Sequence, residues 1–266
     1  MTEDRSTDPA SIGLVSIGVV IPARDEAARI DRCLTAVMAS AAALARSGHV
    51  PIDVRVVVVA DACTDHTVRL LSGWPSVSTV VCMAGAVGTA RAEGVRHLLR
   101  SWDADRIPPH RSWIANTDAD SVVPSSWLTV HAAAARRGAA LLLGTVRPDP
   151  SEIDSSVERS WYSRHQLSDG HRQVHGANLG VRADWYLAGG GFPTLESKED
   201  VGLAASVAVA GGPVERTAAA AVLTSARLVG RTPGGFAEYL RGLCSPGDDA
   251  RADGGSHSGE TAAALA

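Results

Sequence analysis

The sequence alternates short runs rich in valine and isoleucine with segments whose apolar residues recur at helical spacing, and this alternation restricts the fold more than any other feature. A continuously apolar run that stops at a turn residue is typical of a strand buried on both faces of a parallel sheet. The first run, 14–21, stops at Pro22, and the segment after it carries Ile30, Leu34 and Leu44 on one helical face. We therefore predict an α/β fold, a Rossmann-like and mostly parallel sheet flanked by helices. The predicted strands cover 14–21, 54–60, 77–82, 113–117 and 140–146, and the predicted helices cover 26–46, 64–71, 89–99 and 125–136, the last with Ser125 as its N-cap.

The remainder of the chain is less regular and predicts a smaller, mixed region. A length of 266 residues, 45% of them hydrophobic, supplies a core for one large α/β domain or two small ones. The two ends, 1–13 and 245–266, are polar and low in apolar residues, so we expect them to be disordered. Between 147 and 244 we predict a helix through 158–165, strands at 178–181, 214–216 and 221–224, and helices at 200–210 and 236–243.

Charge and composition exclude several classes of partner. The formal net charge of -4 gives no basic field that would attract nucleic acid or anionic lipid. The four cysteines have no metal-ligand spacing, so we expect reduced thiols. No run is apolar for long enough to span a bilayer, and the first residues lack the basic and apolar regions of a signal peptide. We expect a cytoplasmic protein, with a peripheral position at the membrane as the alternative.

Polar residues follow each predicted strand directly. Ligands of an open parallel sheet bind at the carboxyl ends of its strands, so these positions are candidates for a binding site. Each segment taken alone is also explained by the turn formers and helix caps that any strand end needs. Four of them meeting at one edge favour a ligand site instead. The segments are 22–26, 61–65, 85–91 and 118–120.

Asp118 and Asp120 are the sharpest feature among these segments. Two carboxylates one residue apart at the end of a strand point the same way and offer oxygen ligands to a hard cation. Mg²⁺ or Mn²⁺ suits such a site because these ions keep positions open for substrate phosphates. The pair predicts a metal-assisted reaction on a phosphorylated substrate.

Several segments, in this order and spacing, resemble the family 2 glycosyltransferases, which have the GT-A fold. The resemblance extends over about 15–231. It is carried by Val20-Ile21-Pro22-Ala23-Arg24-Asp25-Glu26, Val59-Ala60-Asp61-Ala62-Cys63-Thr64-Asp65, Ala90-Arg91, Asp118-Ala119-Asp120, His175-Gly176-Ala177-Asn178-Leu179-Gly180-Val181-Arg182, Gly190-Gly191-Phe192-Pro193 and Glu199-Asp200.

The resemblance implies a nucleotide diphosphate sugar donor held by the half 14–146 and an acceptor held by the half 147–244 of the same domain. Pro22, Ala23, Arg24 and Glu26 would edge the nucleotide pocket. In the same way Asp61 would bind the base, Arg91 the base or diphosphate, Asp118 the ribose, and Asp120 the metal. The chain has Ala92 where the family often has asparagine after Ala-Arg, so one polar contact to the donor is absent or comes from elsewhere.

Arg227 and Arg231 resemble the basic C-terminal segment of the family and would clamp the diphosphate, since arginine fits phosphate geometry. Two loop arginines are equally explained as surface residues that pair with acids or water.

The acceptor side is assigned by the same resemblance. An acceptor hydroxyl that attacks must lose a proton, and the family supplies the base from a Glu-Asp pair, here Glu199 and Asp200, with Asp200 the usual base. Acids in a first helical turn are also favoured by the helix dipole alone. His175, Gly176 and Asn178 would contact the acceptor. His175 has two alternatives, a structural histidine or a third ligand for Mn²⁺, and Asn178 has one, holding a turn.

The resulting hypothesis is an inverting, metal-dependent glycosyltransferase that uses a UDP- or GDP-sugar and a small-molecule or lipid-carrier acceptor. A nucleotidyltransferase is the nearest alternative, but it usually has a glycine-rich phosphate loop after the first strand, and 22–26 contains no glycine. A non-catalytic nucleotide-sugar-binding protein is the third possibility; an intact Asp118, Asp120 and Asp200 argue against it.

Overall fold

A computed structural model describes residues 13–48, 50–165, 167–193, 198–230 and 236–244. In these residues eight strands form one sheet in the order β3-β2-β1-β4-β7-β6-β8-β5. The expected disorder of the two ends therefore concerns residues that lie outside the described ranges, apart from Gly13. The strands are β1 Ser16–Ala23, β2 Asp53–Asp61, β3 Val77–Cys82, β4 Ser112–Asn116, β5 Ser121–Val122, β6 Leu141–Pro148, β7 Leu179–Arg182 and β8 Val214–Thr224.

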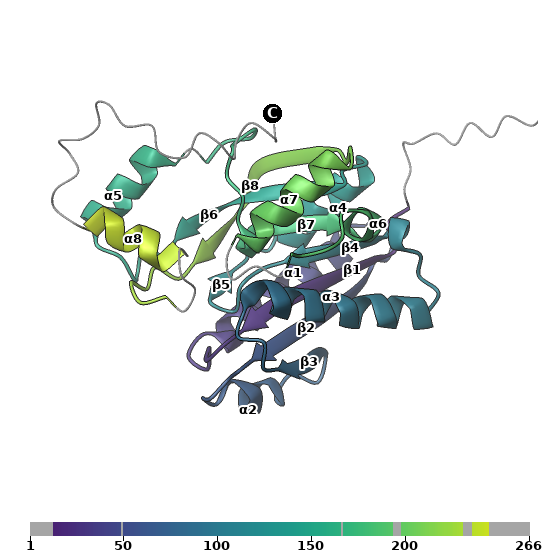
Figure 1. Ribbon diagram of the computed structural model, residues 1–266, viewed down its shortest axis with the longest axis horizontal. Helices are drawn as coiled ribbons and strands as arrows, with labels where there is room; N and C mark the ends of the chain where they lie inside the picture. The colour runs from purple at the N-terminus through teal and green to yellow at the C-terminus, as the bar shows by residue number, and fades with distance from the viewer. Residues whose placement is uncertain (1–12, 49, 166, 194–197, 231–235, 245–266) are drawn as a thin grey trace, which may run out of the picture.

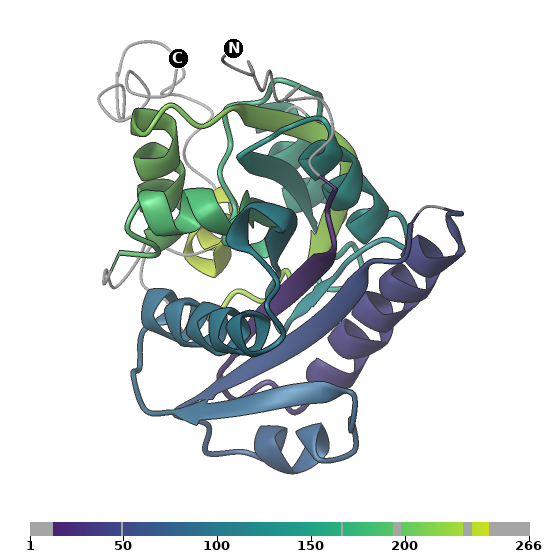
Figure 2. The ribbon, with the colours of Figure 1, turned by 90° about the vertical axis from the view of Figure 1, so that its right-hand side faces the viewer.

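Helices pack on both faces of this sheet, as Figure 2 shows for α1 and α3. Alternate residues of β1 point to opposite faces: Ile17, Val19 and Ile21 join the core beneath α1 and α4, and Val20 joins the core beneath α3, α6 and α7. The helices are α1 Ile30–Arg46, α2 Thr67–Leu71, α3 Val87–Ala104, α4 Trp127–Arg136, α5 Ser155–Arg164, α6 Ala183–Ala188, α7 Glu199–Val209 and α8 Phe236–Cys244, with short 3-10 helices at Pro109–Arg111 and Gly176–Asn178. The predicted α/β class and mostly parallel sheet are confirmed.

Strand β7 runs against its neighbours. It is antiparallel to both β4 and β6, whereas β1 is parallel to β2 and β4, and β6 is parallel to β8. The first residue of β7, Leu179, pairs with the last residue of β4, Asn116. The segment before β7 therefore lies at the edge where the parallel strands end. Because β7 and β8 flank β6, the two predicted halves share one sheet.

Helix α3 packs unusually close to the sheet, and this closeness fixes its first turns at the strand ends. A Cβ at Gly94 would lie 2.6 Å from Cγ1 of Val20, so only glycine permits the observed spacing. Three residues earlier on the same helix, Arg91 is buried.

Some element boundaries differ from the prediction. The strands predicted at 214–216 and 221–224 form one strand, β8. Its alanine run has a low strand propensity, which is why two strands were predicted, but the run continues along β6 through a register shift. Helix α4 begins after Ser126 rather than Ser125, and no side chain caps it. Strand β5 and helix α6 were not predicted, since two and six residues are too short to show a period.

Helices α5 and α8 form a separate wing beside the ends of β6 and β8 (Figure 1). We call α5, α8 and the small core between them the α5–α8 wing. Its core contains Trp161, Leu240 and Ala226, each fully buried. Within the described ranges, no α-helix combines the length and the hydropathy that a bilayer span requires.

Candidate active site

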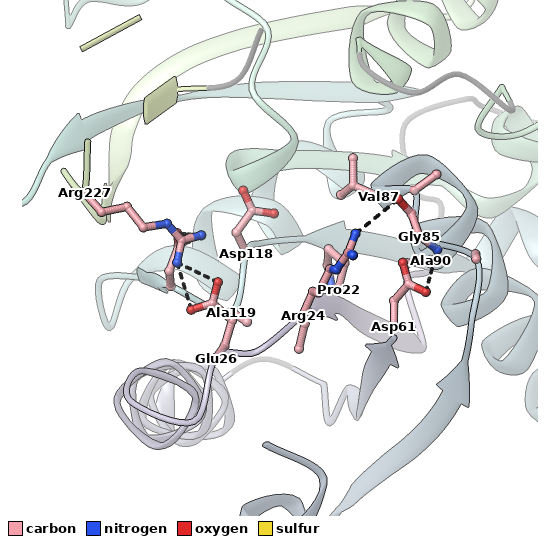
Figure 3. Close-up of a pocket in the computed structure, with 14 residues that line it drawn as sticks. Pro22, Arg24, Glu26, Asp61, Gly85, Val87, Ala90, Asp118, Ala119 and Arg227 are labelled. Carbon is pink, nitrogen blue, oxygen red and sulfur yellow. Dashed lines mark hydrogen bonds and ion pairs between the residues drawn. The ribbon is translucent and has the colours of Figure 1, made fainter. Parts of the chain in front are cut away.

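A pocket of about 410 Å³ opens at the carboxyl ends of β1, β2 and β4 and at the start of α3 (Figure 3). Parallel strands bring these segments together, as the sequence predicted. The pocket is lined by Pro22, Ala23, Arg24 and Glu26 after β1, Asp61 at the end of β2, Ala84 to Val87 and Ala90 around the start of α3, Asp118, Ala119 and Asp120 after β4, and Arg227.

Asp61 forms one end of this pocket. Its carboxylate is almost fully buried and accepts hydrogen bonds at Oδ1 from the backbone N–H of Gly85, at 2.9 Å, and from Sγ of Cys82, at 3.4 Å. Across the mouth, exposed Arg24 donates from Nη1 to the carbonyl of Gly85 at 3.5 Å (Figure 3). The turn at 84–86 therefore lies between a fixed acceptor and a cationic side chain.

Asp25 belongs to the same segment but connects two loops instead of lining the pocket. Its Oδ1 accepts from the backbone N–H groups of Thr64 and Asp65, which ties the loop after β1 to the loop after β2. Asp25 and Ala62 both have positive φ, the sparsely populated left-handed region, and such strained residues persist where surrounding contacts hold them. Sequence reasoning missed this role.

Asp25, Cys63 and Asp65 also form the only trio of described His, Cys, Asp and Glu side chains whose ligand atoms converge. Their atoms are already engaged: Cys63 donates to the carbonyl of Ala23, and Asp65 accepts from Ala27 and Thr67. The trio is part of the turn structure. Among the described residues, His175 does not form such a trio with Asp118 and Asp120.

Asp118 and Asp120 lie side by side after β4 and each meets an arginine. Oδ1 of Asp118 lies 2.6 Å from Nη2 of Arg91, and Oδ2 of Asp120 lies 2.9 Å from Nη2 of Arg227. Burial and the neighbouring Asp118 raise the pKa of Asp120 to about 7, against the opposing effect of Arg227. A largely buried carboxylate whose charge is only partly compensated, beside a second carboxylate, suits a hard divalent cation. The residues present therefore fit Mg²⁺ or Mn²⁺.

Arg227 also reaches Glu26 in the loop after β1. Its Nη1 lies 2.8 and 3.1 Å from the two carboxylate oxygens of Glu26, which is itself buried (Figure 3). The predicted clamp residue is thus in the pocket, paired with two carboxylates. Arg231, its predicted partner, lies outside the described residues.

Arg91 is placed differently from the expectation. It does not line the donor-side pocket. Its buried guanidinium links Asp118 with Glu199, whose Oε1 lies 3.2 Å from Nε. A Cβ at Gly176 would lie 2.5 Å from Nη2 of Arg91, so the arginine packs directly on that backbone. Arg91 therefore connects the end of β4 with the start of α7.

A second pocket of about 460 Å³ lies on the other side of Asp118 and Asp120. It contains the predicted residues Arg91, His175, Gly176, Glu199 and Asp200. The two pockets share Val87, Asp118, Asp120 and Arg227. Sequence reasoning missed further residues of the second pocket, including His165, Lys198, Phe236 and Tyr239, because nothing in their local pattern separates them from surface or core residues.

Asp200, at the start of α7, accepts hydrogen bonds from two backbone N–H groups. Oδ2 accepts from Gly176 at 2.7 Å and Oδ1 accepts from Val201 at 2.8 Å. Burial, and after it the Glu199 carboxylate, raises the pKa of Asp200. A carboxylate that is oriented and more basic than usual suits a general base.

His175 and Asn178 have different environments. Burial, reinforced by nearby His171, lowers the pKa of His175 to about 4, so its ring is neutral, and its Nε2 lies 3.2 Å from Oε1 of Gln173. Asn178 does not reach either pocket. Its amide nitrogen donates to the carbonyls of Thr145 and Ala220, and its oxygen accepts from Nε1 of Trp127. It joins β6, β8 and α4, which is a structural position.

Solved structures with the same architecture place this fold among the GT-A glycosyltransferases. Residues 1–349 of TarS from S. aureus, in complex with UDP, match with a TM-score of 0.56 and 15% identity over 80% of this chain and 61% of that chain. Mannosyltransferase PcManGT from Pyrobaculum calidifontis, in complex with GDP-Man and Mn²⁺, matches with a TM-score of 0.51 and 20% identity over 82% of this chain and 60% of that chain. The chain thus spans about three fifths of the length of these two structures. No match was found among curated proteins.

The sequence itself gives the narrower assignment. Residues 18–184 match the model of glycosyl transferase family 2, a region that contains all four strand-end segments, including Asp118 and Asp120. The chain belongs to glycosyl transferase family 2.

Proposed function

We propose that this chain transfers a glycosyl group from a UDP- or GDP-sugar to a hydroxyl group of an acceptor, with inversion at the anomeric carbon and with Mg²⁺ or Mn²⁺. The observation that carries the proposal is the junction of the two pockets at Asp118, Asp120 and Arg227. A donor in the first pocket and an acceptor in the second would meet at that junction. TarS was crystallised with UDP, and PcManGT with GDP-Man and Mn²⁺, which supports this class of donor.

On the donor side, Asp61 would accept a hydrogen bond from the base and Arg24 would lie over the donor at the pocket mouth. Asp120, with Asp118 beside it, would hold the cation, which when bound supplies positive charge next to the departing diphosphate. Arg227 would add a second positive group on the same side, since a guanidinium matches phosphate oxygens.

On the acceptor side, Asp200 would take the proton of the attacking hydroxyl. The N–H groups of Gly176 and Val201 orient its carboxylate, and its raised pKa favours proton acceptance. Glu199 is occupied by Arg91, so Asp200 is the better base of the two.

The proposal is tested by measuring the melting temperature with UDP-glucose, UDP-N-acetylglucosamine and GDP-mannose, each with and without Mn²⁺. Ligand that binds only the folded protein at 100 times its Kd adds about 2.7 kcal/mol of stability. We expect one nucleotide class to stabilise the wild type with Mn²⁺, and Asp120→Ala to lose most of that gain. Asp105→Ala, which removes an exposed carboxylate paired with Arg55, serves as the control.

Turnover is then measured by mass spectrometry with the stabilising donor. Slow hydrolysis or transfer that stops after chelation supports the proposal. Binding with neither reaction, over a broad pool of acceptors, would favour a non-catalytic binding protein, and undiminished transfer after chelation would remove the metal from the mechanism.

A further inference from the structure

Arg227 occupies the position between the two acidic loops of the donor pocket. Its Nη1 contacts Glu26 at 2.8 Å, and its Nη2 contacts Asp120 at 2.9 Å, so one planar group bridges the ends of β1 and β4. The guanidinium makes the two contacts from two different nitrogens in a fixed plane, whereas an ammonium would have to make both from one nitrogen. The oxygen of Asp120 that faces Arg227 belongs to the carboxylate assigned to the cation.

The backbone next to Arg227 is held in place. The hydroxyl of Ser225 and the backbone N–H of Ala226 both donate to Oε2 of Glu152, and the side chain of Ala226 is buried in the core of the α5–α8 wing. Beyond Arg227, Val229 is 81% exposed. A long side chain on such a base can change partners while its backbone stays where it is.

We infer that Arg227 is an exchangeable counter-ion for Asp120 and Glu26, and that it makes the binding of cation and nucleotide diphosphate interdependent. Without a cation the guanidinium pairs with both carboxylates, and its single positive charge balances one of the two negative charges. A divalent cation beside Asp120 repels Arg227, and the released guanidinium needs a new anionic partner. The diphosphate is that partner. This inference rests on the proposed function and adds a role for Arg227 before the reaction begins.

The inference predicts opposite effects of one substitution on two ligands. In Arg227→Gln the competitor for Asp120 is gone, so Mn²⁺ alone should bind about tenfold more tightly. The diphosphate loses its guanidinium partner, so UDP or GDP in the presence of Mn²⁺ should bind about tenfold more weakly. The factor by which nucleotide improves Mn²⁺ affinity should shrink accordingly, because such coupling is reciprocal.

The experiment measures free Mn²⁺ by electron paramagnetic resonance without nucleotide, and UDP and GDP affinity by calorimetry with Mn²⁺. Arg137→Gln is the matched control, because Arg137 pairs with Glu215 outside both pockets, and its affinities should equal those of the wild type. Arg227→Lys keeps the charge but not the fork. It should tighten Mn²⁺ about threefold, and it serves in place of Arg227→Gln if that variant does not fold.

Unchanged or weaker Mn²⁺ binding in the Arg227 variants would overturn the inference. It would leave the proposed function intact as long as the wild type binds nucleotide with Mn²⁺ and turns over a sugar donor. Tighter Mn²⁺ binding without any nucleotide binding in the wild type would instead support the exchange at Asp120 and contradict the proposed donor.

Discussion

Asp200 is the residue on which the proposed chemistry depends most directly. Its carboxylate must be ionised to accept a proton, and burial together with Glu199 raises its pKa above the ordinary value of 3.8. The rate should therefore fall as the pH decreases through that raised pKa, with full activity on the alkaline side. Asp200→Asn should lower kcat by about 10²–10⁴-fold while donor affinity stays the same.

These effects are checked by steady-state rates of sugar transfer across pH and by calorimetric donor binding. A variant Asp200→Glu should keep part of the activity with a displaced acid limb. Transfer by Asp200→Asn at the wild-type rate would assign the base to another residue.

Residue types and order predicted most of the donor pocket, because strand ends are marked by the apolar runs that precede them. Pro22, Arg24, Asp61 and Asp120 all line one pocket. What the sequence did not reveal is which charged groups pair. Arg91 pairs with Glu199, which lies 108 positions after it in the chain, and Arg227 pairs with Glu26, which lies 201 positions before it. No local pattern encodes such pairings, since they depend on how the sheet brings distant loops together.

At the scale of elements, the spacing between α3 and the sheet is set by glycine. Gly94→Ala should destabilise the protein by about 1–3 kcal/mol, because its Cβ would collide with Val20, even though alanine is the better helix former. Gly242→Ala in α8 is the matched control: nothing lies within 4 Å of the added Cβ, and stability should rise by up to about 1 kcal/mol.

Urea unfolding of both glycine variants measures the two effects. Equal stabilisation by the two substitutions would show that α3 is not confined by β1. Because Val87 and Ala90 in the first turn of α3 line the donor-side pocket, the Gly94 variant should also weaken nucleotide binding.

Element boundaries show where periodicity is informative and where it is not. Helix α1 was predicted within a few residues because its apolar period is long, and strand β3 was predicted because most of its residues are β-branched. Strand β8 was divided in two because its centre is four alanines, Ala218 to Ala221, which carry no strand signal of their own. Pairing with β6, a long-range contact, decides its conformation.

At the scale of the whole molecule, the free energy of unfolding should change with pH because His131 is buried in its neutral form. Burial lowers the pKa of this histidine to about 3, and its Nδ1 accepts from Nε1 of Trp113. The folded state therefore binds the proton less well than the unfolded chain, whose pKa is about 6.5. The stability that neutral His131 contributes is fully present above a pH of about 6.5. It is lost progressively as the pH falls below that value, by about 1 kcal/mol between pH 7 and 5.5.

Urea unfolding at both pH values checks this dependence. His131→Gln retains an acceptor for Trp113 without a titrating ring, so its stability should change less over the same interval. An identical pH dependence in wild type and variant would exclude His131 as the source.

The α5–α8 wing has a core of its own, separate from the two cores that cover the sheet. Trp161→Ala removes its largest buried side chain, a change that costs about 3–5 kcal/mol in a packed core. The loss should remain local: amide exchange should increase in 155–164 and 236–244, and stay unchanged in β1 and β2. Nucleotide binding should weaken, because Ala226, next to Arg227, packs in that core. Uniformly faster exchange across the chain would show instead that the wing unfolds together with the sheet.

The reversed direction of β7 has a consequence for how such an enzyme can diversify. Strand β6 ends, and β7 begins, at the same margin of the sheet, so the intervening stretch 149–178 departs and returns on one side. This stretch contributes His165, His175 and Gly176 to the second pocket, while its Glu152 and Asn178 bind β8 and the turn that follows it. On the proposed function, exchange of His165 and His175 would change the acceptor, whereas Glu152 and Asn178 would have to be kept because they hold the framework next to the donor-side pocket.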